Sequence, residues 1–167
     1  MSQANDYRRT VSHVKTGLTK GSTSTYTTTA ATETSINGKW STDLAIQTTT
    51  ATPTTDARTG VAFVAQTDNT ACAYVFGVTA AGAIAVCQGD IEDTETGSGA
   101  TAGAFKNNPP FPVLPDNFCP IGYLFVRTAP SASDFTFGTS SWTATGITAS
   151  AVVEVDGTLP DRPQPLP

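Results

Sequence analysis

The chain has 167 residues, of which 38% are hydrophobic and only 14% are charged, against about 25% charged residues in an average soluble domain. This length suits one domain with a single core and extended arms, and it excludes two large domains. No segment approaches the roughly 18 to 20 consecutive apolar residues of a membrane span, so we expect no membrane partner.

The net charge of −5 is unevenly distributed. Residues 1–20 contain one acid, Asp6, and four basic side chains, Arg8, Arg9, Lys15 and Lys20, so they carry +3 and the remainder carries −8. This asymmetry indicates a basic segment that meets an acidic partner. Four cations are too few to predict nucleic-acid binding, which grows with the number of phosphates neutralised. Because no apolar run follows the first charges, we expect no secretory signal and synthesis in the cytoplasm.

Residues 1–24 are expected to form a basic arm or a short amphipathic helix. Apolar side chains spaced four, three and four residues apart form one helical stripe: Tyr7, Val11, Val14 and Leu18. A helix this short is not stable alone in water, so it would pack on its own domain, a symmetry mate or a partner. An extended arm is the alternative.

Residues 25–158 are expected to form the folded domain. Threonine favours strands, and Asn37-Gly38 is a strong hairpin signal, so we predict strands at 25–35 and 39–47 joined at that turn. The Thr/Pro segment 48–59 reads as a loop.

Three strands in a meander are predicted between residues 60 and 89. Gly82 suits the left-handed position of a three-residue hairpin loop. Pairing Thr79 with Ala83 places Cys87 opposite Val75 and keeps Cys72 on the other face of the sheet. With Cys119 the cysteines are odd in number and lack a CxxC pair, which predicts reduced, buried thiols rather than disulfides or a zinc site.

The strongest strand signal lies in the last third, where Ile121–Arg127 is apolar on both faces. Shorter strands are predicted at Phe135–Phe137 and Ile147–Val155. Residues 90–108 form an exposed acidic loop, and the prolines that follow favour polyproline II geometry. Residues 159–167 hold four prolines and form an extended tail that lies on this domain or on a neighbour's. The predicted fold is therefore all-β, a jelly-roll-like β-sandwich.

No catalytic or ligand-binding motif is present in the sequence. His13 is the only histidine, which excludes a His-based triad or a His-rich metal site. The acids between residues 90 and 95 lack the EF-hand pattern and read as a solvated loop. No phosphate-binding loop is found, and the aromatic residues are expected in the core or in subunit contacts. We expect no enzyme, no metal and no cofactor.

Four stretches carry a resemblance to known proteins: the threonine-rich strand before Ile-Asn-Gly-Lys (25–40), ACAYVFGVTAAGAIAVCQGDIE (71–92), FPVLPDNFCPIGYLFV (111–126), and FTFGTSSWTATGIT followed by LPDRP (135–148 and 159–163). In this order and spacing they resemble bacteriophage and prophage virion structural proteins of the capsid decoration (cement) or head-fibre kind. The resemblance covers most of the chain after residue 24.

The resemblance implies a non-enzymatic homotrimer on the virion surface that clamps adjacent subunits of the major capsid protein. We expect contact with the shell through Tyr7, Arg8, Arg9, Val11, Val14 and Leu18, and contact with a neighbouring protomer through Pro160, Arg162 and Pro163. A receptor- or glycan-binding fibre module is the alternative, which an exposed aromatic cluster beside the 90–108 loop would favour. A tail or neck component is a third possibility.

Overall fold

The computed structural model describes residues 9–160, and within them every regular element is a β-strand. The all-β prediction is confirmed, and the antiparallel sheets are consistent with a β-sandwich. The strands are β1 (Val11–Ser12), β2 (Thr19–Lys20), β3 (Thr25–Thr27), β4 (Thr34–Ile36), β5 (Lys39–Trp40), β6 (Thr50–Ala51), β7 (Thr70–Thr79), β8 (Ile84–Gln88), β9 (Glu92–Asp93), β10 (Phe118–Thr128), β11 (Ile147–Ala149) and β12 (Val153–Glu154). This part of the chain contains no helix of the length and apolar character that a membrane span requires.

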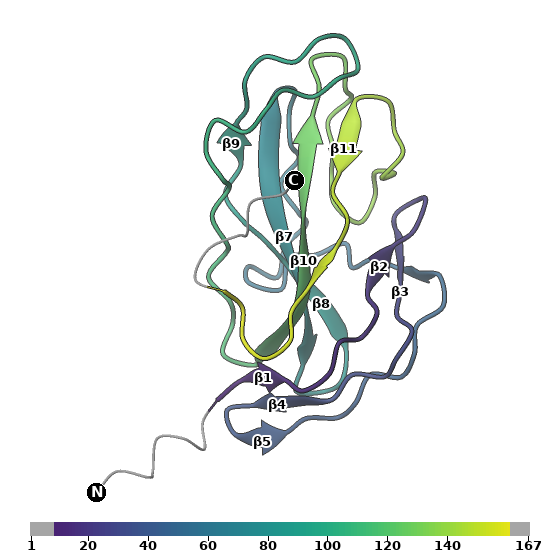
Figure 1. Ribbon diagram of the computed structural model, residues 1–167, viewed down its shortest axis with the longest axis vertical. Coiled ribbons are helices and arrows are strands. Elements are labelled where there is room, and N and C mark those ends of the chain that lie inside the picture. Colours follow the sequence, from purple (N-terminus) through teal and green to yellow (C-terminus); the bar gives the residue numbers. More distant parts are fainter. Residues whose placement is uncertain (1–8, 161–167) are drawn as a thin grey trace, which may run out of the picture.

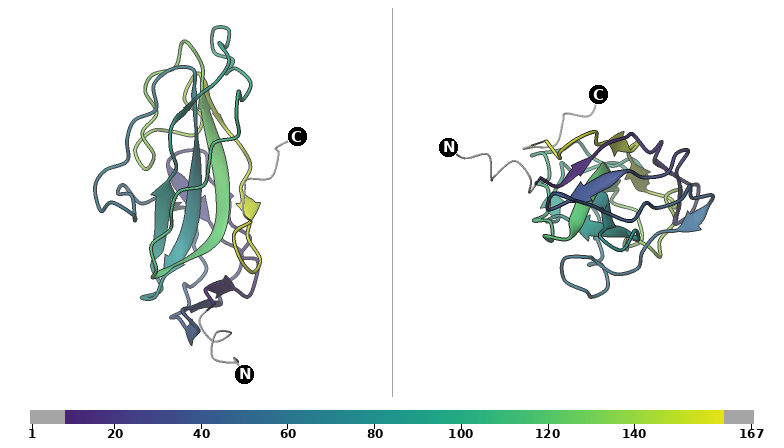
Figure 2. Two further views of the ribbon diagram at one scale, coloured as in Figure 1. Left: turned by 90° about the vertical axis from the view of Figure 1, so that its left-hand side faces the viewer. Right: turned by 90° about the horizontal axis from the view of Figure 1, so that it is seen from below.

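The central sheet is built on the two long strands β7 and β10, which pair antiparallel from Phe118 opposite Thr79 to Arg127 opposite Ala71. Its strand order is β11-β10-β7-β8, with β12 also pairing with β10 and β9 with β7. Two three-stranded sheets complete the fold, β1-β4-β5 and β2-β3-β6. The molecule is elongated along the central strands, and β1-β4-β5 lies at one end (Figure 1, Figure 2).

Nine of the ten residues of β7 are buried, which shows that both faces of the central sheet are covered. Alternation along the strands sends one set of side chains to each face. One face carries the larger core, with Leu18, Tyr26, Phe63, Tyr74, Phe76, Phe135, Phe137 and Trp142 among its members. The other face packs Val75, Tyr123 and Phe125 under the segments 105–114 and 153–159.

Gln66 fastens an irregular segment onto the larger core. Its side chain is fully buried, its Nε2 donates to the Val126 carbonyl at 3.2 Å, and its Oε1 accepts the Tyr74 hydroxyl at 3.0 Å. Its backbone exchanges two hydrogen bonds with Phe135. The strands predicted at 60–67 and 135–137 are not formed: the two segments meet at one isolated bridge, between Gln66 and Phe135, and Ala62 makes another with Thr55.

Two local predictions are confirmed. Asn37 and Gly38 have φ of 53° and 76°, as a two-residue hairpin turn requires, and they join β4 to β5. The β7–β8 hairpin has Cys87 opposite Val75, and all three thiols are free.

The predicted helix is wrong for the described residues. Val11 and Ser12 form β1 against β4, and Ser12, Thr16 and Leu18 are buried while His13 and Lys15 are exposed. This alternation is the period of an extended chain, and the edge of β4 supplies the hydrogen bonds that a lone helix would have made for itself.

An N-terminal arm is not confirmed, since residues 9–24 are integrated in the fold. The predicted strand 25–35 is also divided, into β3 and β4 of different sheets. The predicted strand Ile147–Val155 is interrupted, and its two parts, β11 and β12, both pair with β10.

Candidate functional site

The end of the molecule formed by residues 9–15 and 33–41, here called the tip, presents an exposed tryptophan. Trp40 is 62% exposed, and its indole stacks on the His13 ring with centroids 4.9 Å apart and an interplanar angle of 10°. Val11 pairs with Ser35 across β1 and β4, and Ser35 pairs with Trp40 across β4 and β5. These side chains therefore share one face of the small sheet, and His13 lies two residues beyond Val11 on the same face.

The tip holds this tryptophan in a fixed position. The His13 backbone N–H donates to the Glu33 carbonyl at 2.8 Å, and its Nε2 shares a hydrogen bond of 2.8 Å with Ser35 Oγ. A hollow of about 310 Å³ lies beside the indole, between the turn of β4-β5 and residues 80 and 117. An indole fixed by stacking loses little rotamer freedom on binding, so the tip is suited to docking.

The tip is also where exposed cations gather. Arg9, Lys15 and Lys39 are all exposed, with Glu33 as an exposed acid among them. Tryptophan and arginine are enriched among the residues that dominate protein–protein binding energies, so Trp40 and Arg9 are the side chains of the tip best suited to binding a protein.

The hydrogen bond between His13 and Ser35 is the arrangement at the tip that most resembles a catalytic His–Ser pair. Nucleophilic catalysis by serine also needs an acid that orients the other ring nitrogen and donors that stabilise an oxyanion. Within residues 9–160 the structure gives no side-chain acid a hydrogen bond to this ring. The His13–Ser35 pair is therefore better suited to a binding surface than to catalysis of bond cleavage.

The sequence-predicted contact residues are only partly brought together. Arg9 and the half-buried Val11 lie at the tip, and Val14 follows just beyond β1, half-buried. The prediction that Leu18 contacts the shell is wrong, because its side chain is 2% exposed in the larger core and is not available to a partner. Pro160 is half-buried on a different part of the chain. Tyr7, Arg8, Arg162 and Pro163 lie outside the described residues.

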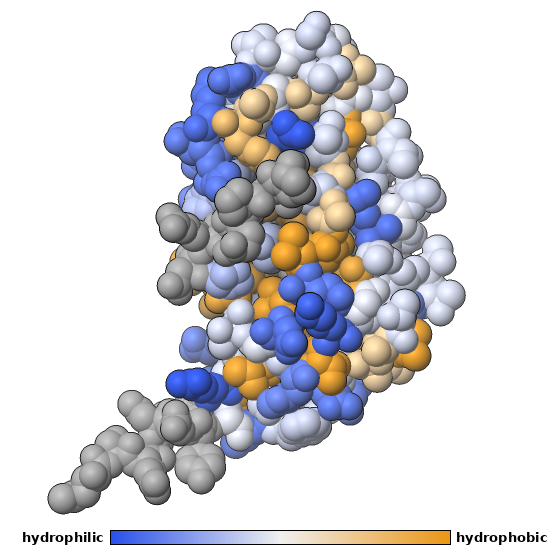
Figure 3. Space-filling model, in the orientation of Figure 1, coloured by the Kyte–Doolittle hydropathy of each residue, from blue (hydrophilic) through white to orange (hydrophobic). Residues whose placement is uncertain are grey.

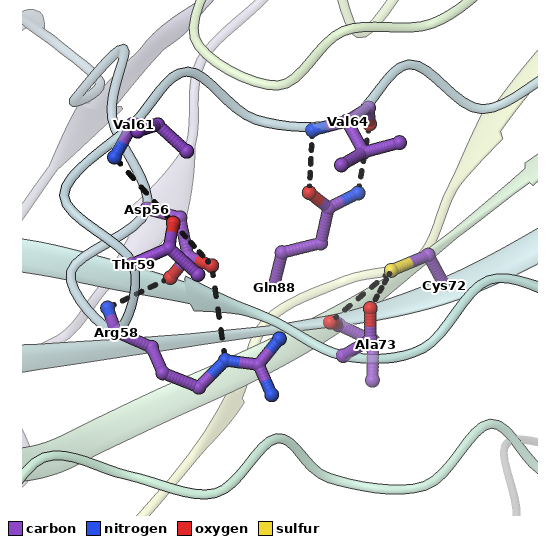
Figure 4. A network of polar contacts seen from close by, with 9 residues as sticks. Asp56, Arg58, Thr59, Val61, Val64, Cys72, Ala73 and Gln88 are labelled. Carbon is purple, nitrogen blue, oxygen red and sulfur yellow. Dashed lines mark hydrogen bonds and ion pairs between the residues drawn. The ribbon is translucent and has the colours of Figure 1, made fainter.

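A second apolar surface, here called the valine ridge, consists of Val61 and Val64 on the loop 56–64, which are 61% and 64% exposed. Figure 4 shows how the loop is held. Gln88 Oε1 accepts from the Val64 backbone N–H and its Nε2 donates to the Val64 carbonyl, both at 2.8 Å. The buried Asp56 accepts from the Arg58 backbone N–H at 2.9 Å. These bonds fix an apolar loop whose two valines remain exposed among the described residues.

A third feature, here called the side hollow, has a volume of about 430 Å³ and lies on the face of the central sheet that carries the smaller core. Phe125 and Arg127 of β10 form its floor together with Thr148, which pairs with Arg127 from β11. Phe105 forms a wall, with its ring 5.7 Å from that of Phe125. The Arg127 guanidinium lies 5.0 Å from the centre of the Phe105 ring.

The three thiols offer no reactive group. Burial raises the pKa of Cys72, Cys87 and Cys119 to about 12 in each case. Since the thiolate is the nucleophile and the metal ligand, these side chains are inert at neutral pH. The residues described here also contain no group of three or more His, Cys, Asp or Glu side chains able to hold a metal ion.

The raised thiol pKa values predict lower stability in mild alkali. Above a pH of about 8.5 the unfolded chain releases thiol protons that the folded chain keeps, so unfolding becomes easier as the pH rises. Between pH 8 and pH 9 each thiol should cost about 0.7 kcal/mol, or about 2 kcal/mol in total. Urea unfolding at the two pH values measures this loss. A variant with all three cysteines replaced by alanine serves as control, and an equally large loss in that variant would contradict the explanation.

On the face shown in Figure 3 the right-hand side is mostly pale, whereas hydrophobic residues gather in the middle among hydrophilic ones. Three features of the described residues are suited to binding: the tip, the valine ridge and the side hollow. No family model, curated protein or solved structure matches this chain, so its function is inferred from its own residues.

Proposed function

We propose that this chain is a structural protein of a bacteriophage particle, a decoration protein that binds the outer surface of the head and stabilises contacts between major capsid subunits. It catalyses no reaction and is made in the host cytoplasm before it joins the virion. The resemblance of residues 25–40, 71–92, 111–126 and 135–148 to such proteins supports the identity of the partner.

The observation that carries the docking part of the proposal is the exposure of Trp40 on a fixed surface. Tryptophan is enriched at protein interfaces because its ring is apolar and its N–H is polar, and Trp40 has 62% of its surface open to solvent although it is stacked on His13. Burying an indole against a partner removes a large apolar area from water, and tryptophan is among the residues that dominate binding energies. The tip is therefore the surface that meets the shell, with Arg9 and Val11 beside Trp40.

In this proposal the sandwich is jelly-roll-like and the protein is a homotrimer seated at or near a symmetry axis. Tyr7 and Arg8 extend the contact that the tip makes with the shell. The proline-rich tail, residues 159–167, lies on a neighbouring protomer through Pro160, Arg162 and Pro163. Each contact is modest, but three linked copies bind with an avidity far above that of one.

The test is the protein content of purified phage particles. Particles of the phage that encodes this chain, isolated on a density gradient, should contain it at a fixed ratio to the major capsid protein by quantitative mass spectrometry. Native mass spectrometry of the purified protein should give a trimer. Absence from the particles would refute the proposal, and retention on isolated tails but not on heads would assign the chain to the tail or neck instead.

A further inference from the structure

The side hollow contains a cation, Arg127, that has no counter-charge among residues 9–160. Arg127 is half-buried, its Nη1 donates to the Gly103 carbonyl at 2.7 Å, and its guanidinium faces the Phe105 ring. Within residues 9–160 no carboxylate lies within 4.0 Å of it, since the ion pair found there joins Arg58 and Asp56. A charge that is partly removed from water is unfavourable unless an opposite charge or hydrogen bonds compensate it.

The register places one acid, Glu92, on the same face of the sheet as Arg127, and the two described side chains form no ion pair. Glu92 of β9 pairs with Ala71 of β7, which pairs in turn with Arg127 of β10. Two strand spacings separate the backbones of Glu92 and Arg127 by about 10 Å. The guanidinium has five N–H donors, and the hydrogen bond to Gly103 uses one of them. Donors therefore remain for a carboxylate from outside the described chain.

The other walls of the hollow supply the rest of a binding site. Thr148 stands opposite Arg127 on β11, is exposed, and its hydroxyl makes no hydrogen bond within the described chain. Ser150 instead fixes the wall, because its Oγ accepts from the Phe125 backbone N–H at 3.0 Å and donates to the Ala151 carbonyl at 2.8 Å. The half-buried Phe105 adds an apolar ring to the wall. Aromatic lining with a few directed polar groups is the usual make-up of a small-ligand pocket.

The size and charge of the hollow restrict the ligand class. Its volume of about 430 Å³ is at the lower end of the range of roughly 300 to 1,000 Å³ seen for ligand pockets. One guanidinium in a chain of net charge −5, with Glu92, Asp93 and Glu95 on the neighbouring loop, disfavours polyanions such as nucleic acid. A ligand with one carboxylate, several hydroxyls and an apolar ring face fits these groups.

We propose that the side hollow binds a carboxylate-bearing saccharide, with Arg127 pairing its carboxylate, Thr148 bonding a ring hydroxyl and Phe105 packing against the apolar face of the sugar. This role is independent of the capsid proposal, because the hollow does not involve the tip. A particle protein with such a site would attach its particle to acidic glycans on a cell surface. The 90–108 segment itself lines part of the hollow, through Ala104 and Phe105.

The test uses the full chain, with glucuronic acid and N-acetylneuraminic acid as probes and glucose and N-acetylglucosamine as uncharged controls. Saturation-transfer NMR and calorimetry should detect binding of at least one of the two acids and no comparable binding of the neutral sugars. Arg127→Gln should weaken that binding about 10- to 100-fold, as expected when a hydrogen bond to a charged group is lost. Arg58→Gln, which removes an arginine outside the hollow, should leave the affinity unchanged.

A second variant keeps the test valid if Arg127→Gln is poorly folded. Thr148→Ala changes only an exposed side chain and should weaken binding about 3- to 10-fold without altering the unfolding transition. Failure of the wild-type chain to bind either acid, equal binding of the neutral sugars, or unchanged affinity in folded Arg127→Gln would each overturn the proposal. Because the variants leave the tip intact, their occupancy on phage particles should stay at the wild-type level, which separates this site from the docking surface.

Discussion

Phe137→Ala is expected to lower the free energy of unfolding by about 3 to 5 kcal/mol. Phe137 is fully buried, and its ring centre lies 4.6 Å from that of Tyr74, 4.8 Å from Phe63 and 5.3 Å from Trp142. Tyr74 belongs to the central strand β7, whereas the other two side chains come from irregular segments. Removing the ring leaves a cavity at the point where these segments meet the sheet, and backbone pairing does little to hold them there.

Urea unfolding followed by tryptophan fluorescence measures this effect, with Trp142 as a reporter inside the affected cluster. Val113→Ala is the matched control, because Val113 is 75% exposed and surface substitutions usually change stability by less than about 0.5 kcal/mol. A loss below about 1 kcal/mol for Phe137→Ala would show that the aromatic cluster does not hold the irregular segments on the sheet.

Trp40→Ala is expected to weaken binding to phage heads about 30-fold, the effect of losing a tryptophan hot spot worth about 2 kcal/mol. The indole is exposed and, among residues 9–160, its ring stacks on that of His13, so its removal should leave the free energy of unfolding nearly unchanged. Affinity is measured by titrating the purified protein onto heads assembled without it and counting bound copies. This prediction depends on the proposed function.

Ile46→Ala is the matched control for Trp40→Ala, since Ile46 is 57% exposed and lies outside the tip. It should bind like the wild-type chain. The valine ridge provides the contrasting variant, Val61→Ala with Val64→Ala. If that double variant loses binding and Trp40→Ala does not, the ridge and not the tip is the docking surface.

The elements that the sequence predicts well are those set by nearest neighbours along the chain. The turn at Asn37-Gly38 needs only two residues that tolerate positive φ. The β7–β8 register follows from a three-residue loop, and β10 follows from an apolar run that must be buried on both faces. Each of these signals lies within about a dozen residues, a distance at which pattern and turn chemistry decide the structure.

The N-terminal segment shows why other elements could not be predicted. The stripe through Val11, Val14 and Leu18 satisfies helical spacing, yet β4, more than twenty residues away, offers an edge that pairs β1. Gly17, with a φ of 63°, further disfavours a helix at this point. Tertiary pairing therefore overrides a short amphipathic pattern.

The proposed binding surfaces could not be predicted from the sequence for the same reason. Trp40 resembles a core residue until β5 proves to be a two-residue strand at the edge of a small sheet. Arg127 ends an apolar run, and only the register with β11 and the path of residues 103–105 place it beside Thr148 and Phe105. No local pattern carries that information, because the partners are more than twenty residues apart.

The proposed function is tested most directly by electron cryomicroscopy of intact phage particles produced in the presence of this chain. The account predicts density for residues 9–160 outside the shell, in groups of three around a symmetry axis, with Trp40 and β1-β4-β5 against the major capsid protein. Particles that carry no such density on the head, or that carry it with Trp40 facing the solvent, would contradict the account.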